Sequence, residues 1–241
     1  SLADWTLRMR TISALLGTLA ILLLARAAWR LGGPTAGAIA AAITALSPGL
    51  VQVSHFYTAD ALLVPEIALL ADACVLLLSG GGAAAMAYAA VALALIALTK
   101  LPGVLVGLLI PFSIAWVRTS AVPPPAGAQP WQRRVVRWLR ASVSARTFAI
   151  VGGAGILFVL AQPWLLDGRG LPAGEGNRSG LWMLGAYFQE REFPWHDWRF
   201  TYNDEIPFLY WLVTIFPYVL GGPVALAGYL GVLRAYEPDV P

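Results

Sequence analysis

The sequence predicts an all-α integral membrane protein, a polytopic helical bundle of about seven spans. The chain has 241 residues, of which 59% are hydrophobic and 12% are charged, whereas soluble domains carry about 25% charged residues. Apolar runs near the length needed to cross a bilayer recur along it. We expect spans at 5–31, 36–53, 61–78, 83–98, 104–117, 147–165 and 206–234. The whole chain, 1–241, is expected to form a single transmembrane domain.

Short breaks separate the first five spans. Residues 32–34 read Gly-Gly-Pro, and the proline suits the first turn of a new helix. A polar island at 54–60 follows the second span, and a Ser-Gly-Gly-Gly run at 79–82 ends the third. Residues 99–103, Thr-Lys-Leu-Pro-Gly, interrupt the apolar pattern before the fifth. These breaks predict tight connections between neighbouring helices.

Two longer polar segments separate the later spans. Within 118–146, one helical face of 131–140 would carry Trp131, Val135, Trp138 and Leu139, with arginines opposite. This pattern is typical of a helix that lies in the headgroup plane beside anionic lipid. A basic loop that only fixes the topology is the alternative. The second segment, 166–205, is acidic and rich in aromatic residues.

The distribution of charge orients the bundle. One set of helix ends and loops holds nine arginines, namely Arg26, Arg30, Arg118, Arg133, Arg134, Arg137, Arg140, Arg146 and Arg234. By the positive-inside rule that side is cytoplasmic. The N-terminal residues, the 54–60 island, Lys100 and the 166–205 loop then share the external face. Polar groups far apart in the sequence are therefore predicted to gather on one side.

The 54–60 island carries His55, Tyr57 and Asp60 between two apolar spans. Ionisable groups at the end of a span are costly unless they serve a function. They are candidates for binding or acid–base chemistry, with Asp60 as a general base, a metal ligand or a helix cap. The alternative is a simple turn at the lipid boundary in which Asp60 caps the next helix.

Three cations are expected at the same face. Lys100 ends a run of about 16 residues, or ~24 Å of helix, which is shorter than the ~30 Å hydrocarbon core. Its ammonium would lie just below the external surface, where it could bind an anionic headgroup or simply reach water. Arg8 and Arg10 lie at the external end of the first span, against the charge trend. An anionic ligand would explain them, and so would pairing with acids of the 166–205 loop.

Glu66 and Asp72 lie deeper in the third span and are interpreted as structural partners for arginine or other polar groups. No cofactor motif is present. A divalent metal held by His55, His196 and Asp60 remains open, although no short ligand motif supports it. A net charge of +3 without a basic-aromatic pattern argues against nucleic acid as a partner.

Several segments together resemble the polyprenyl-phosphate-dependent membrane glycosyltransferases of the GT-C fold, the group of dolichyl-phosphate-mannose protein mannosyltransferases and aminoarabinose transferases. The resemblance lies in 10–15 (Arg-Thr-Ile-Ser-Ala-Leu), the Ala-rich 37–48 ending in Ser-Pro, 54–63, Leu-Thr-Lys at 98–100, 198–210, and 221–228. Their order along the chain carries it as much as any single segment.

The resemblance implies transfer of a hexose or pentose from a polyprenyl-phosphate donor to a protein, lipid or glycan acceptor. Such enzymes act at the external face, which in the inner membrane of a bacterium is periplasmic. It implies Asp60 as the acid of the second external loop, and Lys100 with Arg10 near the lipid phosphate. His55, Tyr57 and Arg8 are further candidates for substrate binding. The family's main catalytic acid would lie in a loop before Ser1, so we expect the chain to be an N-terminally truncated fragment.

Two other functions compete with this interpretation. A transporter or flippase of a lipid-linked or anionic solute would use Glu66 and Asp72 to line a cavity open alternately to both sides. A non-catalytic membrane subunit would pair its external polar groups among themselves. The enzyme instead predicts that Asp60, Lys100 and Arg10 converge at one face.

Overall fold

The computed structural model describes residues 2–55, 58–99, 101–120 and 131–162. Within these residues the regular structure is helical, and short turns join the helices, which confirms the predicted all-α class. The elements are α1 (Leu2–Ala45), α2 (Pro48–His55), α3 (Ala59–Leu78), α4 (Ala83–Thr99), the 3-10 helix η1 (Leu101–Leu108), α5 (Leu109–Ser120), α6 (Trp131–Ser142) and α7 (Ala145–Ala161). The predicted 166–205 loop and the last span lie outside the described residues.

The chain divides into two compact units. The first unit, Ser1–Leu46 with Leu50–Phe158, contains all the packing described below. The second unit takes in Ser47–Gly49 and Val159–Pro241, of which the structure describes only 47–49 and 159–162. The prediction of a single domain stays a prediction.

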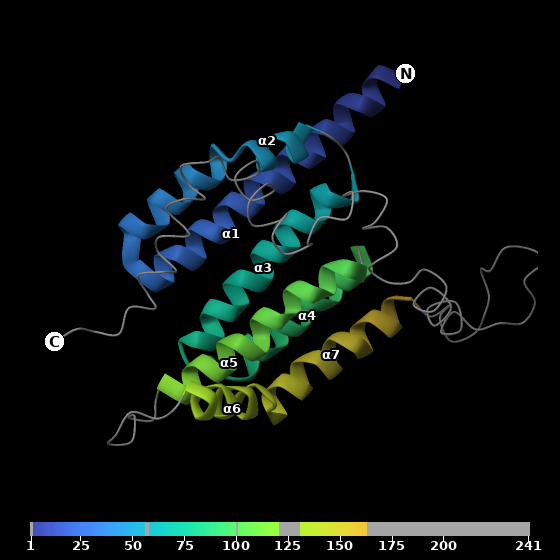
Figure 1. The fold of residues 1–241 in the computed structure, drawn as a ribbon. Helices are drawn as coiled ribbons and strands as arrows, with labels where there is room; N and C mark the ends of the chain where they lie inside the picture. Colours follow the sequence, from blue (N-terminus) through green and yellow to red (C-terminus); the bar gives the residue numbers. More distant parts are fainter. Residues whose placement is uncertain (1, 56–57, 100, 121–130, 163–241) are drawn as a thin grey trace, which may run out of the picture. The chain divides into compact units, whose positions relative to one another are not determined.

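Helix α1 consists of two arms that meet at Gly33. This glycine has φ 78° and ψ −172°, a left-handed conformation that side chains with a Cβ rarely adopt, and Pro34 follows it. The second arm turns back along the first (Figure 1), so closely that a Cβ at Gly37 would lie 3.1 Å from the Ala25 carbonyl oxygen. The predicted break at 32–34 is therefore confirmed.

The predicted second span, 36–53, is wrong as a continuous helix. It ends at Ala45, and α2 begins at Pro48. Proline has no N–H for an intrahelical bond and disfavours helical geometry at the residue before it. Pro48 therefore starts a new helix.

Helices α3 and α4 form the centre of the first unit and run antiparallel (Figure 1). Gly80, at φ 81°, ends α3, and the Gly81 N–H donates to the Leu76 carbonyl oxygen at 2.9 Å. This is the glycine C-cap that the 79–82 run predicts. Their interface is built from small and aliphatic side chains, including Ala73, Leu77, Ala85, Ala89, Ala92, Leu93 and Ile96. Such residues let helices approach closely in a membrane.

The predicted fifth span, 104–117, is in part wrong. Its first half is the 3-10 helix η1, and only its second half is α-helical. A Cβ at Gly103 would lie 2.9 Å from Ile96 Cγ2, and one at Gly107 2.8 Å from Leu93 Cδ1. The two glycines thus let the η1 backbone lie directly on α4.

Helix α6 confirms the predicted helix at 131–140. It is joined to α7 through a 45° bend, where the Ser144 hydroxyl accepts a hydrogen bond from the Thr147 N–H at 3.2 Å. This bond caps α7, which therefore begins at Ala145, two residues before the predicted span 147–165.

The apolar helices are those of a membrane protein. Asp4–Ala45 and Asp60–Leu78 are long and apolar enough to cross a bilayer, and the bent pair of α6 and α7 is a third candidate by length and composition. Two shorter apolar helices, Ala83–Thr99 and Gly103–Thr119, lie among them.

Candidate functional site

Four helix ends of the first unit lie at one end of the structure (Figure 1): the start of α1, the end of α2, the start of α3 and the end of α4. They are the ends that the sequence places outside the membrane. The candidate residues belong to them or to the segments that connect them. We refer to this end as the candidate site end.

A buried carboxyl group connects α3 to the end of α4. The Thr99 hydroxyl donates to Glu66 Oε1 at 2.7 Å. Glu66 is 8% exposed, and its second oxygen, Oε2, is buried without a hydrogen-bond partner in the described part of the chain. Glu66 follows Asp60 by six residues, which is about 9 Å of helix. The end of α4 therefore lies beside α3, less than two turns below Asp60.

A close helix contact sets the position of α2 beside α1. Gly17 faces Ser54, and a Cβ at position 17 would collide with the Ser54 hydroxyl, which itself donates to the Leu50 carbonyl oxygen at 2.8 Å. Arg10 precedes Gly17 by seven residues, so it lies on the same side of α1, about 10 Å nearer the N-terminus. The contact therefore holds the end of α2 close to the part of α1 that carries Arg10.

Asp60 is exposed and lies in the first turn of α3. The N-cap is Thr58, at φ −134° and ψ 166°, and its side chain makes no capping bond. The alternative in which Asp60 is the helix cap is therefore wrong. Asp60 thus lies in the first turn of α3, where the positive end of the helix dipole favours an acidic residue.

The other predicted site residues have varied outcomes. His55 ends α2 with Nδ1 2.7 Å from the Val51 carbonyl oxygen, and Arg8 and Arg10 are exposed on α1. Tyr57 and Lys100 lie outside the described residues. Among the residues that the structure describes, no three His, Cys, Asp or Glu side chains group as a metal site.

A second ionic cluster ties the other half of α3 to its neighbours. Asp72 is fully buried and accepts from Arg26 Nη2 at 2.5 Å and from Arg30 Nη1 at 2.6 Å. Arg26 also donates to the Tyr88 hydroxyl at 3.1 Å. The interpretation of Asp72 as a partner for arginine is confirmed, and that of Glu66 as a partner for a polar group is confirmed by Thr99.

The sequence alone does not identify which residues pair with Asp72 and Glu66. Arg26 and Arg30 are four residues apart, a spacing that puts both on one face of a helix, and this signal could have suggested that they share an acid. For Glu66, the corresponding signal is its position along α3, because an antiparallel α4 brings its last turn, with Thr99, beside that position.

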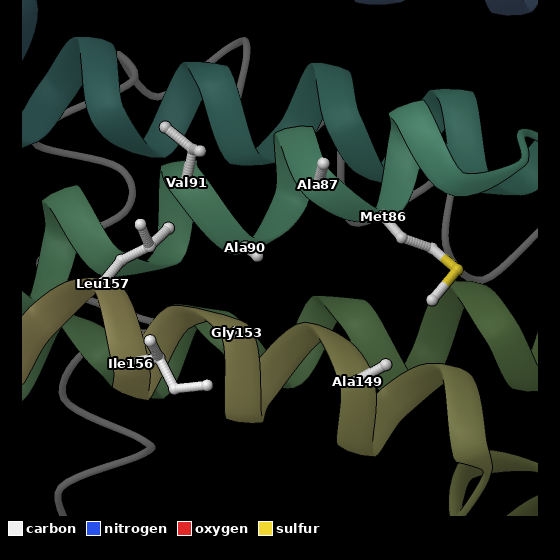
Figure 2. Close-up of a pocket in the computed structure, with 8 residues that line it drawn as sticks. All are labelled: Met86, Ala87, Ala90, Val91, Ala149, Gly153, Ile156 and Leu157. Carbon is white, nitrogen blue, oxygen red and sulfur yellow. The ribbon is translucent and has the colours of Figure 1, made fainter.

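An apolar crevice of about 430 Å³ lies between α4 and α7 (Figure 2). It is lined by Met86, Ala87, Ala90, Val91, Ala149, Gly153, Ile156 and Leu157. Gly153 and Ala90 form its floor, since a Cβ on the glycine would lie 3.5 Å from the alanine Cβ. With only apolar side chains, the crevice can hold an apolar chain but supplies no acid, base or nucleophile.

Comparison with known proteins gives one finding. A family model described as dolichyl-phosphate-mannose-protein mannosyltransferase matches residues 4–123, which run from the start of α1 past the end of α5. No curated protein and no solved structure matches the chain.

Proposed function

Because residues 4–123 match the family model of dolichyl-phosphate-mannose-protein mannosyltransferases, we propose that this chain transfers a sugar from a polyprenyl-phosphate donor to an acceptor at the external face of the membrane. The family's general activity is glycosyl transfer from such donors. The sugar, the acceptor and the membrane face are our proposal, with the inner membrane of a bacterium and its periplasmic side as the setting.

The bond between Glu66 and Thr99 is the observation that carries this proposal. It fixes the end of α4 beside the start of α3. Lys100 follows Thr99 directly in the sequence, and Asp60 opens α3. The two candidates therefore belong to helix ends that are held together, as an enzyme site at one membrane surface requires.

The proposed chemistry needs a cation and a base at that surface. As the bond between the sugar C1 and the donor phosphate breaks, negative charge grows on the departing polyprenyl phosphate, and Lys100 with Arg10 would stabilise it. A carboxylate takes the proton of the acceptor hydroxyl, whose oxygen forms the new bond to C1. We propose Asp60 as a candidate for this general base within the chain, and His55, Tyr57 and Arg8 as residues that bind the sugar or the phosphate.

The crevice between α4 and α7 is suited to the isoprenoid part of the donor. One of its lining residues, Val91, lies on α4, whose C-terminal end is at the candidate site end (Figure 1). Val91 precedes Thr99 by eight residues, or about 12 Å. A lipid with its phosphate near the end of α4 could thus place its hydrocarbon chain in the crevice.

The transporter interpretation has less support. It needs Asp72 to be available in a cavity, but this carboxylate is fully buried between two arginines. A carboxylate held between two arginines in this way fits a structural role.

The test is sugar transfer by the full-length protein in vesicles that contain polyprenyl-phosphate-linked sugar. We expect Lys100→Ala and Asp60→Asn each to lower the rate at least about 100-fold, the lower range for loss of a charge-stabilising or acid–base group. Arg118→Gln is the control, because it removes one positive charge at the other end of the helices. We expect its rate of sugar transfer to equal that of the unchanged protein. Near-normal transfer by both site variants would remove the assignment.

A second pair of variants tests the crevice between α4 and α7. Gly153→Leu would fill it, whereas Gly152 does not line it and a Cβ there has no neighbouring atom within 4 Å. We expect only the first to raise the donor concentration needed for half-maximal rate. Equal effects of the two substitutions would show that the crevice does not bind the donor. The assignment of Asp60 and Lys100 would be unaffected.

A further inference from the structure

A second apolar groove, of about 690 Å³, is lined by residues of η1, α5 and α6. Of these elements, α6 belongs to the segment 118–146 that the sequence places on the cytoplasmic side. The groove is lined by Leu105, Val106, Leu108, Leu109, Pro111, Phe112, Trp138, Leu139, Ser142 and Val143. Large apolar side chains stand open in it: Leu108 is 69% exposed and Val143 66%. A hydrocarbon occupant would remove this surface from water or from disordered lipid.

Aromatic contacts fix the walls of the groove. Phe112 of α5 meets Trp138 of α6 edge to face, with ring centroids 5.5 Å apart, and stacks on Trp116 at 6.2 Å. Tryptophan is enriched where the hydrocarbon of a bilayer meets its headgroups. Trp138 in the wall of the groove therefore suits a lipid bound near that boundary.

The polar face of α6 supplies unbalanced positive charge. From residue 73 to residue 166 the sequence contains no Asp or Glu but seven basic residues, Lys100, Arg118, Arg133, Arg134, Arg137, Arg140 and Arg146. Arg140 is exposed, and Nε of Arg137 is buried without a hydrogen-bond acceptor among the described residues. Guanidinium groups bind phosphate oxygens well through their fixed fork of N–H donors.

We propose that this groove binds an anionic glycerophospholipid, with its acyl chains along α5 and its phosphate on Arg137 and Arg140 of α6. The apolar wall that includes Trp138 and Leu139 suits acyl chains, and Arg137 and Arg140 flank these two residues in the sequence of α6. The cytoplasmic leaflet is where anionic headgroups are concentrated. Helix α6 lies beyond the residues matched by the family model. The site therefore does not rest on the proposed sugar transfer.

The test counts bound lipids on the intact protein. The purified protein in detergent is titrated with phosphatidylglycerol or with phosphatidylcholine, and bound lipid is measured by native mass spectrometry. We expect preferential binding of phosphatidylglycerol. Arg137→Gln with Arg140→Gln should weaken it about 25-fold, since each arginine near an anionic headgroup contributes about fivefold, or about 1 kcal/mol.

Two matched controls separate a defined site from general attraction. Arg118→Gln with Arg146→Gln removes the same charge from exposed positions on α5 and α7 rather than α6, and should weaken lipid binding less than about fivefold. Val143→Trp should fill the groove and reduce binding, whereas Val151→Trp, exposed on α7 outside both apolar sites, should not.

Several results would overturn the proposal. Equal losses from the two arginine pairs would indicate a diffuse charge effect. Displacement of the lipid by inorganic phosphate alone would indicate an anion site without a tail. Equal binding of the two lipids, or none, is the result expected if another part of the chain or a second copy covers the groove.

Discussion

Replacing Asp72 with asparagine removes the charge that holds α1 to α3. The carboxylate is fully buried, and each of its oxygens accepts from a different arginine, at 2.5 Å from Arg26 and 2.6 Å from Arg30. Asparagine has nearly the same shape, so the change creates no cavity. It leaves two guanidinium groups without their counter-charge and offers one of them an NH₂ group in place of an acceptor.

The expected cost follows from how well the arginines can reach solvent. Breaking a buried ion pair by removing one partner costs about 3–5 kcal/mol, whereas an exposed pair contributes about 0–1 kcal/mol. The Arg26 side chain is 49% exposed and that of Arg30 32%, so both can regain part of their hydration. We therefore expect a loss of about 2–3 kcal/mol, or about 4–12 °C in Tm for a chain of this size.

The assay is thermal unfolding of the purified protein in detergent, followed by the loss of helical circular dichroism. Asp60→Asn is the matched control, since it makes the same substitution at an exposed position of the same helix and should change Tm by no more than about 2 °C. Adding Arg30→Gln to Asp72→Asn should recover part of the loss, because it removes one uncompensated charge.

A Tm for Asp72→Asn within the range of the Asp60→Asn control would refute this reasoning. So would a double variant that loses the full sum of the two single effects, because the three charges would then not act as one unit.

Three further predictions concern helix contacts and are measured by the same thermal unfolding. Gly17→Ala should cost about 1–3 kcal/mol by forcing α2 from α1, and Ser54→Ala in the same chain should restore most of it; no rescue would contradict the contact. Thr99→Val should cost about 1–3 kcal/mol because Glu66 loses its hydrogen-bond donor, while Glu66→Gln, which still accepts that bond, should cost less; the reverse order would count against the pair. Ser144→Ala should cost about 1 kcal/mol through loss of the α7 cap, and an unchanged Tm would show that the cap is dispensable.

The helix order could be predicted because apolar runs and glycine breaks are local signals. Gly33 and Gly80 adopt the positive φ values that end a helix, as their runs in the sequence indicate. The misses have local causes too. Pro48 lies in an apolar run, where the hydrophobic pattern hides its effect as a helix breaker. The 3-10 path of η1 depends on how closely Gly103 and Gly107 approach α4, which is a tertiary contact.

The candidate site could be predicted only as far as the side of the membrane. Alternation of spans puts Asp60 and the end of α4 on one side, and the contact of Thr99 with α3 agrees with that. The pairs themselves depend on the rotation and axial offset of two helices, which no single span reveals. The convergence of Asp60, Lys100 and Arg10 stays a prediction.

The two acids of α3 explain how its start can be held level with the end of α4. Glu66 and Asp72 are six residues apart, so they point about 240° apart around the helix axis. One can therefore bond to Thr99 of α4 while the other accepts from the arginines of α1. Two ties on different faces, about 9 Å apart along the axis, oppose both sliding and rotation of α3 in an apolar interface that resists neither strongly. A site assembled from helix ends needs such ties, because a slip of one turn would move Asp60 by about 5.4 Å, more than the reach of a hydrogen bond.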